Sequence, residues 1–355
     1  MIVCAVVPAH NEENNIQNTI GDLVAQTYKL YKIIVVDDFS TDKTSDIVKK
    51  LILKYPEQLV LLKTDKAELR AGAMNKGLEF LKENIKCDFV LSADADCRFD
   101  KNVVSEALKS FEKDNSVGGV CSIAGVLNPV FYKKDGILKN VEKWILWRLQ
   151  RLEYAGFDAT RTATWKSVLI LHGLCSVFRF NSIIEVGGYA PNHLLEDYKL
   201  TLQLKKAGWK TVFNPKIIAN TDAIYSIKKL IRQRLRWMIG GIRIILEEGI
   251  NKYTFEDFFS HIVFIALLIT ILATVIPQSI KYGWHFHLNF SFLPVTLAIG
   301  GYLFSLYNLK YVKNIDIFDI VIRVLILPEL LLSIFFSWLQ VWAYGSVLLK
   351  SKEVW

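Results

Sequence analysis

Three short, largely apolar runs in the first hundred residues of this 355-residue chain each lead into a group of acidic or amide side chains. Each run has the length and composition of a buried β-strand, and segments with helical character separate the runs. This alternation predicts an α/β fold, with a mostly parallel sheet covered by helices on both faces. The runs are Ile2–Val7, Ile33–Val36 and Cys87–Leu91, and the polar groups that follow them are Asn11-Glu12, Asp37-Asp38 and Asp94-Ala95-Asp96.

The polar groups follow the same end of each predicted strand, the carboxyl end. Open α/β sheets bind ligands beyond the carboxyl ends of their strands, at the point where the strand order reverses. The pattern therefore indicates a nucleotide site. Neither the dinucleotide-binding pattern G-x-G-x-x-G nor a P-loop follows the first run, so the phosphates would need a cation in place of a glycine-rich cradle.

Asp94 and Asp96 are the candidate ligands of that cation. Residues two apart on an extended chain point to the same side, so we expect both carboxylates to face one spot. Two adjacent carboxylates repel each other unless a cation lies between them, and Mg²⁺ and Mn²⁺ prefer oxygen ligands. The alternative is a pair of solvated aspartates in a loop, which is how an isolated Asp-x-Asp is commonly found.

The second part of the chain has the composition of a membrane protein. Hydrophobic residues make up 52% of the sequence, and they are concentrated after about residue 255. The net charge is +8, but the basic residues form no long tract; they are densest between Lys228 and Arg243, which fits a cytoplasmic juxtamembrane region better than a nucleic-acid groove. We expect a catalytic domain at 1–225, an amphipathic interfacial region at 226–254 and three or four membrane segments in 255–355, at about 258–276, 290–307 and 317–349.

The first part of the chain is expected in the reducing cytosol. Its five cysteines are scattered and odd in number, and Met1 leads directly into an apolar run without a basic leader, so no signal peptide is expected. The chain is predicted to be a multi-pass protein of the cell membrane, with its catalytic domain in the cytoplasm.

Two segments in the middle of the chain allow two interpretations each. Lys139–Arg151 mixes tryptophans and leucines with basic residues, which is typical of a helix packed on the sheet or of a helix at a membrane surface. Glu196 and Asp197 open a strongly periodic helical segment that Gly208 closes. These carboxylates could complement the helix dipole, or one could be a general base. His172 is interpreted as a structural histidine.

A third segment, Arg232–Trp237, places Gln233, Arg236 and Trp237 on one face of a helix. An amide, a guanidinium and an indole suit a diphosphate or a sugar acceptor, because arginine stabilises a phosphate leaving group that gains charge. A basic helix on anionic lipid is the other interpretation. Both can hold on different faces of the helix.

Taken together, these motifs resemble the inverting family 2 glycosyltransferases of the membrane-bound synthase type, which include the cellulose, chitin, hyaluronan and poly-N-acetylglucosamine synthases and are related to the ceramide glucosyltransferases. The resemblance covers about residues 1 to 245, and the combination in this order is specific although each motif alone is weak. The motifs are Pro8-Ala9-His10-Asn11-Glu12-Glu13, Val36-Asp37-Asp38, Ala71-Gly72-Ala73-Met74-Asn75, Asp94-Ala95-Asp96, Glu196-Asp197 and Gln233-x-x-Arg236-Trp237.

The resemblance implies a nucleotide-sugar-binding GT-A domain, a UDP-sugar donor, and Mg²⁺ or Mn²⁺ bound by Asp94 and Asp96. It implies that Asp37 and Asp38 hold the base and ribose, with Arg70 in place of the more common lysine. The full set of donor-site residues that it implies is Pro8, Ala9, Asn11, Glu12, Asp37, Asp38, Arg70, Asn75, Asp94 and Asp96.

On the acceptor side, the resemblance implies that Asp197 is the general base, with Glu196 beside it. Gln233, Arg236 and Trp237 would hold the diphosphate and the acceptor sugar. A single displacement at the anomeric carbon would convert an α-linked donor into a β-linkage. The threonine that usually precedes the Glu-Asp pair is replaced by Leu195, and the membrane segments are expected only at the C-terminal side.

Three functions follow from this resemblance. The first is extension of a β-linked polysaccharide with hexose or N-acetylhexosamine units. The second is the same chemistry that ends after one sugar on a lipid or lipid-linked acceptor, and the third is a membrane sensor that binds nucleotide sugars without turnover. The expected partners are the UDP-sugar, the acceptor and the lipid bilayer, with no nucleic acid, and a homo-oligomer is compatible with all three.

Overall fold

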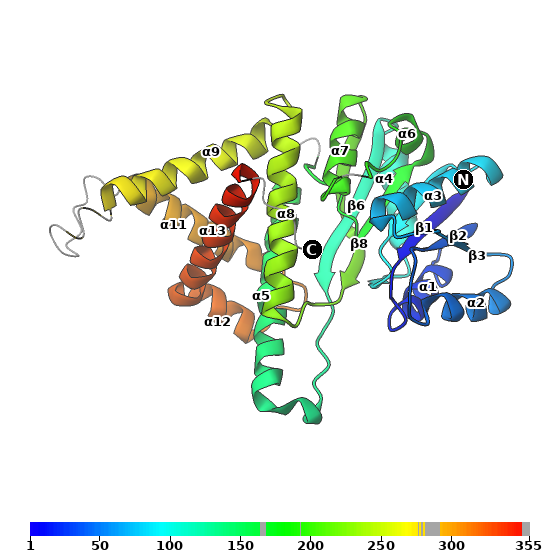
Figure 1. The fold of residues 1–355 in the computed structure, drawn as a ribbon, viewed down its shortest axis with the longest axis horizontal. Coiled ribbons are helices and arrows are strands. Elements are labelled where there is room, and N and C mark those ends of the chain that lie inside the picture. The colour runs from blue at the N-terminus through cyan, green and yellow to red at the C-terminus, as the bar shows by residue number, and fades with distance from the viewer. Residues whose placement is uncertain (164–167, 192, 276, 278–279, 281–291, 350–355) are drawn as a thin grey trace. The chain divides into compact units, whose positions relative to one another are not determined.

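The computed structural model describes residues 1–163, 168–191, 193–275, 277, 280 and 292–349. The chain divides into two compact units, Met1–Gln233 and Arg234–Trp355. The first unit contains a β-sheet covered by helices (Figure 1). The described residues of the second unit form helices and short connections.

The described residues of the first unit form an eight-stranded sheet with the order β3-β2-β1-β4-β7-β6-β8-β5. The three apolar runs of the sequence lie in β1, β2 and β4. The strands are β1 (Val3–Ala9), β2 (Lys32–Asp37), β3 (Leu59–Lys63), β4 (Phe89–Ala93), β5 (Cys97–Phe99), β6 (Val117–Val126), β7 (Cys175–Arg179) and β8 (Lys210–Thr221).

The half of the sheet built from β3, β2, β1 and β4 is parallel, as the sequence predicts. Strands β1, β2 and β4 are buried over almost their whole length, whereas β3 at the edge of the sheet is mostly half-buried. Successive residues of β1 alternate between two apolar clusters. Val3, Ala5 and Val7 pack on one face of the sheet, while Cys4 and Val6 pack on the other. Continuous apolar strands are needed here because helices cover both faces.

Helices of the first unit cover the two faces of the sheet as two sets. Residues of α1, α2 and α4 belong to one cluster, and residues of α3, α6 and α7 belong to the other. The helices that lie wholly within this unit are α1 (Ile16–Val24), α2 (Thr44–Lys54), α3 (Leu69–Asn84), α4 (Val103–Lys113), α5 (Gly136–Ala163), α6 (Phe180–Glu185) and α7 (Glu196–Lys206), with a short 3₁₀ turn at Lys133–Asp135. Helix α8 (Ile227–Glu248) begins in the first unit and continues into the second.

The other half of the sheet is mixed. Strand β7 runs antiparallel to both β4 and β6, and β5 runs antiparallel to β8, whereas β6 and β8 are parallel. Strands β6 and β7 lie in the middle of the chain, where the hydrophobic pattern of the sequence is less regular. The fold class is therefore α/β with a mixed sheet, in which the half that precedes Asp94 and Asp96 is parallel.

Helix α5 contains the segment Lys139–Arg151, and its later turns fit the interpretation of a helix packed on the sheet, whereas the membrane-surface interpretation stays a prediction. From Leu146 onward it packs on the sheet: Leu146 and Leu152 are buried, and the Gln150 amide exchanges hydrogen bonds with the backbone of Ile224. Ile137 and Leu138, in its first turn, are more than 80% exposed. Packing on the sheet therefore buries the later turns of α5 and leaves its first turn exposed.

The second unit contains α9 (Phe255–Thr270), continued by a π-helical turn (Ile271–Val275), then α11 (Phe292–Tyr307), a 3₁₀ turn (Asn308–Tyr311), α12 (Ile317–Val324) and α13 (Ile326–Leu348). Among the described residues, two stretches are long and apolar enough to cross a membrane, Phe255–Ala273 and Leu330–Leu348. Residue 276 and residues 290 and 291, at the edges of the expected membrane segments, lie outside the described residues.

The last apolar run is divided into two helices at Leu325, which has an extended backbone (φ −73°, ψ 118°). Pro328 lies in the first turn of α13, where a proline costs no helical hydrogen bond. Asp316 caps α12 by accepting hydrogen bonds from the amides of Phe318 and Asp319.

Candidate functional site

The carboxyl ends of β1, β2 and β4 lie at one edge of the parallel half-sheet. Ala9, the last residue of β1, is in register with Asp37, the last residue of β2, and Val6 is in register with Ser92 of β4. Because the three strands are parallel neighbours, the polar groups that follow them emerge at the same edge. This arrangement confirms the expectation drawn from the three apolar runs.

Asp37 and Asp38 are buried and hold the loops at this edge. The Asp37 carboxylate accepts hydrogen bonds from the Ser40 amide (3.1 Å) and from the Ser45 hydroxyl. Oδ1 of Asp38 accepts hydrogen bonds from the Thr64 hydroxyl (2.9 Å) and from the amide of Glu68 (2.8 Å). These bonds give both residues a structural role, and their role toward a nucleotide stays a prediction.

The loop after β1 is joined to the loop after β2. Pro8 and Ala9 are the last two residues of β1, and Asn11 follows in a left-handed conformation (φ 57°) that asparagine tolerates better than most residues. Oδ1 of Asn11 accepts a hydrogen bond from the Thr41 amide (2.8 Å). The Asn11 amide donates to the Ser40 hydroxyl (3.0 Å). The donor-site residues predicted on these two loops therefore lie next to each other.

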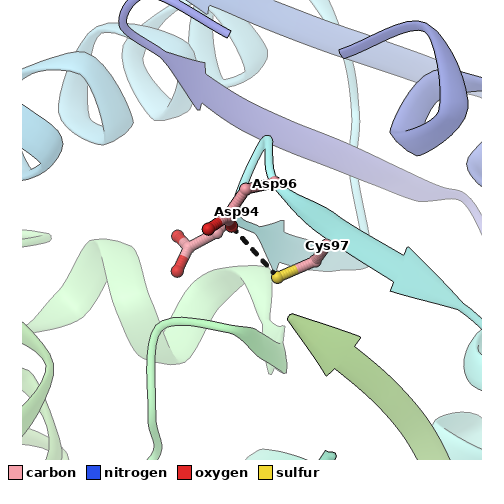
Figure 2. A group of neighbouring side chains, drawn as sticks. All are labelled: Asp94, Asp96 and Cys97. Carbon is pink, nitrogen blue, oxygen red and sulfur yellow. Dashed lines mark hydrogen bonds between the residues drawn. The ribbon is translucent and has the colours of Figure 1, made fainter. Parts of the chain in front are cut away.

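Asp94 and Asp96 are brought together, but by a turn and not by an extended strand. Strand β4 ends at Ala93, and Asp94–Asp96 form the connection to β5, in which the Cys97 amide donates to the Asp94 carbonyl (3.3 Å). The alternation of an extended chain is therefore the wrong reason for their proximity. Ligand atoms of Asp94, Asp96 and Cys97 lie within 4.8 Å of one another (Figure 2).

The chemistry of this group fits a hard divalent cation bound by the two carboxylates. Burial and the charge of Asp94 raise the pKa of Asp96, as expected for two carboxylates with no cation between them. Burial also raises the pKa of the Cys97 thiol well above its usual range, so Cys97 is a neutral thiol that donates to Oδ1 of Asp96 (3.4 Å). Oxygen ligands suit Mg²⁺ and Mn²⁺, whereas a neutral thiol does not.

Two further carboxylates face this pair. Burial raises the pKa of Glu12 to about 7, and the charges of Asp96, Asp94 and Asp222 add to the increase. Asp222 follows β8, and its charge also raises the pKa of Asp96. Asp222 is not among the residues predicted from the sequence, and its position directly after β8 is the signal that could have found it.

Asp197 lies in the first turn of α7. Its Oδ1 accepts a hydrogen bond from the Tyr198 amide (2.8 Å), and its Oδ2 accepts one from the Gly173 amide (3.2 Å). Burial and the neighbouring charge of Glu196 raise the pKa of Asp197 to about 6, while the charge of Arg70 opposes the increase. A carboxylate with this pKa is ionised at neutral pH and can still accept a proton.

Arg70 brings the two ends of the candidate site together. Its Nε donates to Oδ1 of Asp94 (2.7 Å), and its Nη1 donates to Oε1 of Glu196 (3.1 Å). Both ion pairs are largely shielded from solvent. One guanidinium therefore contacts the carboxylate after β4 and the carboxylate that opens α7, although 102 positions separate the two residues in the sequence (196 − 94).

Asn75 is engaged with the protein. Its Nδ2 donates to the Tyr189 carbonyl (2.7 Å), and its Oδ1 accepts from the Tyr189 amide (2.8 Å), so its amide fixes the loop before α7. A Cβ on Gly188, which has a φ of 77°, would come within 2.6 Å of the Asn75 Oδ1. The resemblance implies a donor-binding role for Asn75, whereas these bonds indicate a structural role.

We expect Asn75→Ala to lower the free energy of unfolding by about 1–3 kcal/mol, because the buried Tyr189 backbone would lose both of its partners. Denaturant unfolding of the variant would measure this loss. Affinity for UDP, measured by calorimetry, should stay close to that of the wild type. A large loss of UDP affinity with unchanged stability would assign Asn75 to the donor site instead.

The remaining candidate residues are placed as follows. His172 is structural, as predicted: its Nε2 pairs with the Ser122 carbonyl (2.8 Å), and burial lowers its pKa to about 3, so it is neutral. Gln233 is the last residue of the first unit, whereas Arg236 and Trp237 belong to the second. All three lie on α8, and their role at the diphosphate and acceptor stays a prediction.

The comparisons with known proteins agree with this geometry. Residues 4–187 match the family model for glycosyl transferase family 2, which is about half of the chain. Poly-beta-1,6-N-acetyl-D-glucosamine synthase of Staphylococcus aureus (strain MSSA476) is 23% identical over 270 residues, which are 75% of this chain and 61% of that protein. The enzyme of the same name from Staphylococcus epidermidis is 23% identical over 306 residues, 85% of this chain and 68% of that one.

The chain thus spans about three-fifths of the length of the first of these relatives. Among solved structures, a mannosyltransferase from Pyrobaculum calidifontis in complex with GDP-Man and Mn²⁺ superposes with a TM-score of 0.63. The superposition covers 99% of this chain and 88% of the mannosyltransferase. The sequence identity is 16%, so the likeness supports the fold alone. The match to the family model, over the strands and turns that carry Asp37, Asp38, Asp94 and Asp96, shows that this chain belongs to glycosyl transferase family 2.

Proposed function

We propose that the protein is a membrane-bound inverting β-glycosyltransferase that transfers a hexose or N-acetylhexosamine from a UDP-sugar to a growing polysaccharide. Family membership and the names of the relatives support the reaction class and make N-acetylglucosamine the first sugar to test. The two long apolar stretches, Phe255–Ala273 and Leu330–Leu348, support attachment to a bilayer. The catalytic unit is proposed to lie on the cytoplasmic side.

One observation carries this proposal: Arg70 contacts both Asp94 and Glu196. A transferase of this kind needs its general base close to the bound donor, so that the acceptor hydroxyl can contact the base and the anomeric carbon together. The guanidinium places the carboxylate that follows β4 beside the pair that opens α7. A pair of solvated aspartates in a loop, which was the alternative for Asp94 and Asp96, would not have Asp94 paired with an arginine that is shielded from solvent.

Asp197 is proposed as the general base. Its carboxylate takes the proton of the acceptor hydroxyl while that oxygen forms a bond to the anomeric carbon of the donor. The bond between the anomeric carbon and the diphosphate breaks in the same displacement, and UDP leaves with the electron pair. Two backbone amides hold the Asp197 carboxylate, and its pKa of about 6 keeps it ionised at neutral pH.

The donor is proposed to bind at the edge formed by the loops after β1, β2 and β4. Asp37 and Asp38 would flank the base and ribose, and Asp94 and Asp96 would hold a divalent cation. That cation, when bound, neutralises negative charge on the diphosphate. Gln233, Arg236 and Trp237 would contact the diphosphate and the acceptor sugar.

The proposal is tested with the full chain in nanodiscs of stated lipid composition, incubated with UDP-GlcNAc, UDP-glucose or GDP-Man. Mn²⁺ or Mg²⁺ is supplied, and both UDP or GDP release and the labelled product are measured. The expected result is metal-dependent UDP release with a labelled product that is retained by a size filter. Product that remains in the organic phase would assign a single addition to a lipid. Binding without release for every donor would contradict an enzymatic function.

The rate of transfer is expected to fall on the acid side with an apparent pKa near 6. Asp197 must be ionised to accept a proton, so its protonation below about pH 6 removes the active form. The profile of kcat against pH, measured with saturating donor and cation, should decline about tenfold per pH unit below this value. A flat profile between pH 5 and 7, with the protein still folded, would contradict Asp197 as the base.

A further inference from the structure

Arg70 donates four hydrogen bonds, all of them to the protein. Besides Asp94 and Glu196, its Nη2 donates to the Ser92 hydroxyl (3.1 Å) and to the Gly173 carbonyl (2.9 Å). A guanidinium has five N–H groups, so these contacts use four of them. Its Cζ also lies 5.4 Å from the centre of the Tyr189 ring, within the range of a cation–π contact.

Gly173 connects Arg70 to the proposed base. The carbonyl of Gly173 accepts from Arg70 (2.9 Å), and the amide of Gly173 donates to Oδ2 of Asp197 (3.2 Å). The approach is close: a Cβ on Gly173 would lie 2.8 Å from the Arg70 Cζ and 2.9 Å from its Nη2. A glycine is therefore required for this guanidinium to reach the backbone at this point.

The contacts form two short chains from the donor side to the acceptor side. The first runs from Asp94 through Arg70 to Glu196, and the second runs from Asp94 through Arg70 and Gly173 to Asp197. A lysine could supply the charge but not the planar fork that reaches four acceptors in different directions.

We propose that Arg70 is a positioning residue that holds the base Asp197 in register with the donor-side carboxylate Asp94, and that it is not a ligand of the nucleotide. This inference rests on the proposed function and differs from the nucleotide-binding role that the family resemblance implies. Arg70 acts on Asp197 through position, by means of Glu196 and Gly173, and through charge. The charge of Arg70 favours the ionised form of Asp197.

Two substitutions of Arg70 test the inference in the full chain. Arg70→Met is expected to lower kcat about 100-fold, because even a small displacement of a catalytic group has an effect of this size. Arg70→Lys keeps the charge without the fork and is expected to lower kcat about tenfold. The affinity for UDP with Mn²⁺, measured by calorimetry without turnover, should not fall in either variant.

Two further readouts separate positioning from a general structural role. The acid limb of the kcat–pH profile should move to higher pH in Arg70→Met and less in Arg70→Lys, because only the former removes the charge that opposes the raised pKa of Asp197. Hydrogen exchange of peptides that cover residues 172–176 should become faster. Arg98→Met is the matched control, since it breaks an arginine–aspartate pair with Asp22 (2.6 Å) outside the candidate site, and it should change none of these readouts.

A reciprocal variant displaces the guanidinium without removing it. Gly173→Ala is expected to lower kcat by a factor similar to that of Arg70→Met, about 100-fold, again with UDP affinity retained. Gly21→Ala is its control, because a Cβ at this exposed helical position meets no atom within 4 Å.

The inference would be overturned if Arg70→Lys and Arg70→Met lost UDP affinity in proportion to their loss of kcat/KM while kcat stayed unchanged. That result would support a contact between Arg70 and the nucleotide. Full activity of Arg70→Met would also overturn the inference. If the wild type transfers no sugar from any donor, the proposed function fails instead. Exchange at residues 172–176 then decides whether Arg70 positions this segment.

Discussion

Replacement of Asp197 by asparagine is expected to lower kcat by about 1,000- to 10,000-fold, which is the upper range for loss of a general base. Asparagine has nearly the same shape, but it cannot take up the proton of the acceptor hydroxyl. The affinity for UDP with Mn²⁺ should stay within about threefold of the wild type, because the Asp197 carboxylate accepts hydrogen bonds from the amides of Tyr198 and Gly173, which do not belong to the loops after β1 and β2. Initial rates of UDP release and calorimetric titration measure the two quantities.

The control for Asp197→Asn is Asp46→Asn. Asp46 makes an exposed ion pair with Lys49 on α2, and the substitution removes the same charge away from the candidate site. Its rate and stability should match those of the wild type. Retention of more than a tenth of the activity in Asp197→Asn would transfer the role of base to another group, and Glu196 would be the next residue to test.

The second large effect is expected from Asp96→Asn, with a loss of activity of about 1,000-fold, since a cation at a phosphate leaving group stabilises the transition state by several kcal/mol. A readout independent of activity is the melting temperature. Mn²⁺ should raise the melting temperature of the wild type, because a ligand that binds only the folded state stabilises it. This increase should be much smaller in Asp96→Asn.

Without metal, Asp96→Asn should be at least as stable as the wild type at neutral pH. The folded-state pKa of Asp96 is raised, so its ionised form costs stability as the pH rises above the pKa of the unfolded chain. Asparagine removes that cost. Asp46→Asn again serves as the control and should keep the full response to Mn²⁺. An unchanged Mn²⁺ shift in Asp96→Asn, together with normal activity, would contradict a cation site at this turn.

The parallel half of the sheet could be predicted because its signals are local. Apolar runs of strand length predict β1, β2 and β4, and parallel strands bring their carboxyl ends to one edge whatever the details of their connections. The acidic groups of this edge were therefore found without any knowledge of packing. Glu196 as the first residue of α7, and Gly208 after its end, were likewise visible in the helical period.

The other half of the site depends on contacts between distant segments, which single-sequence patterns do not carry. Strands β6 and β7 lie in a part of the chain with weaker periodicity, and β7 joins the sheet antiparallel to β4 through tertiary pairing. Asp222 reaches the acidic group because β8 ends there. The bonds of Arg70 to Asp94, Glu196 and Gly173 span up to 126 positions along the chain and could not be foreseen from it.

The most direct test of the account is the configuration of the new glycosidic bond. The full chain in nanodiscs, supplied with an α-linked UDP-sugar and Mn²⁺, should yield a product whose anomeric proton shows the large coupling of a β-linkage. A single displacement with Asp197 as base and no covalent intermediate requires this inversion. An α-linked product would contradict the account, because retention of configuration requires a mechanism other than a single displacement.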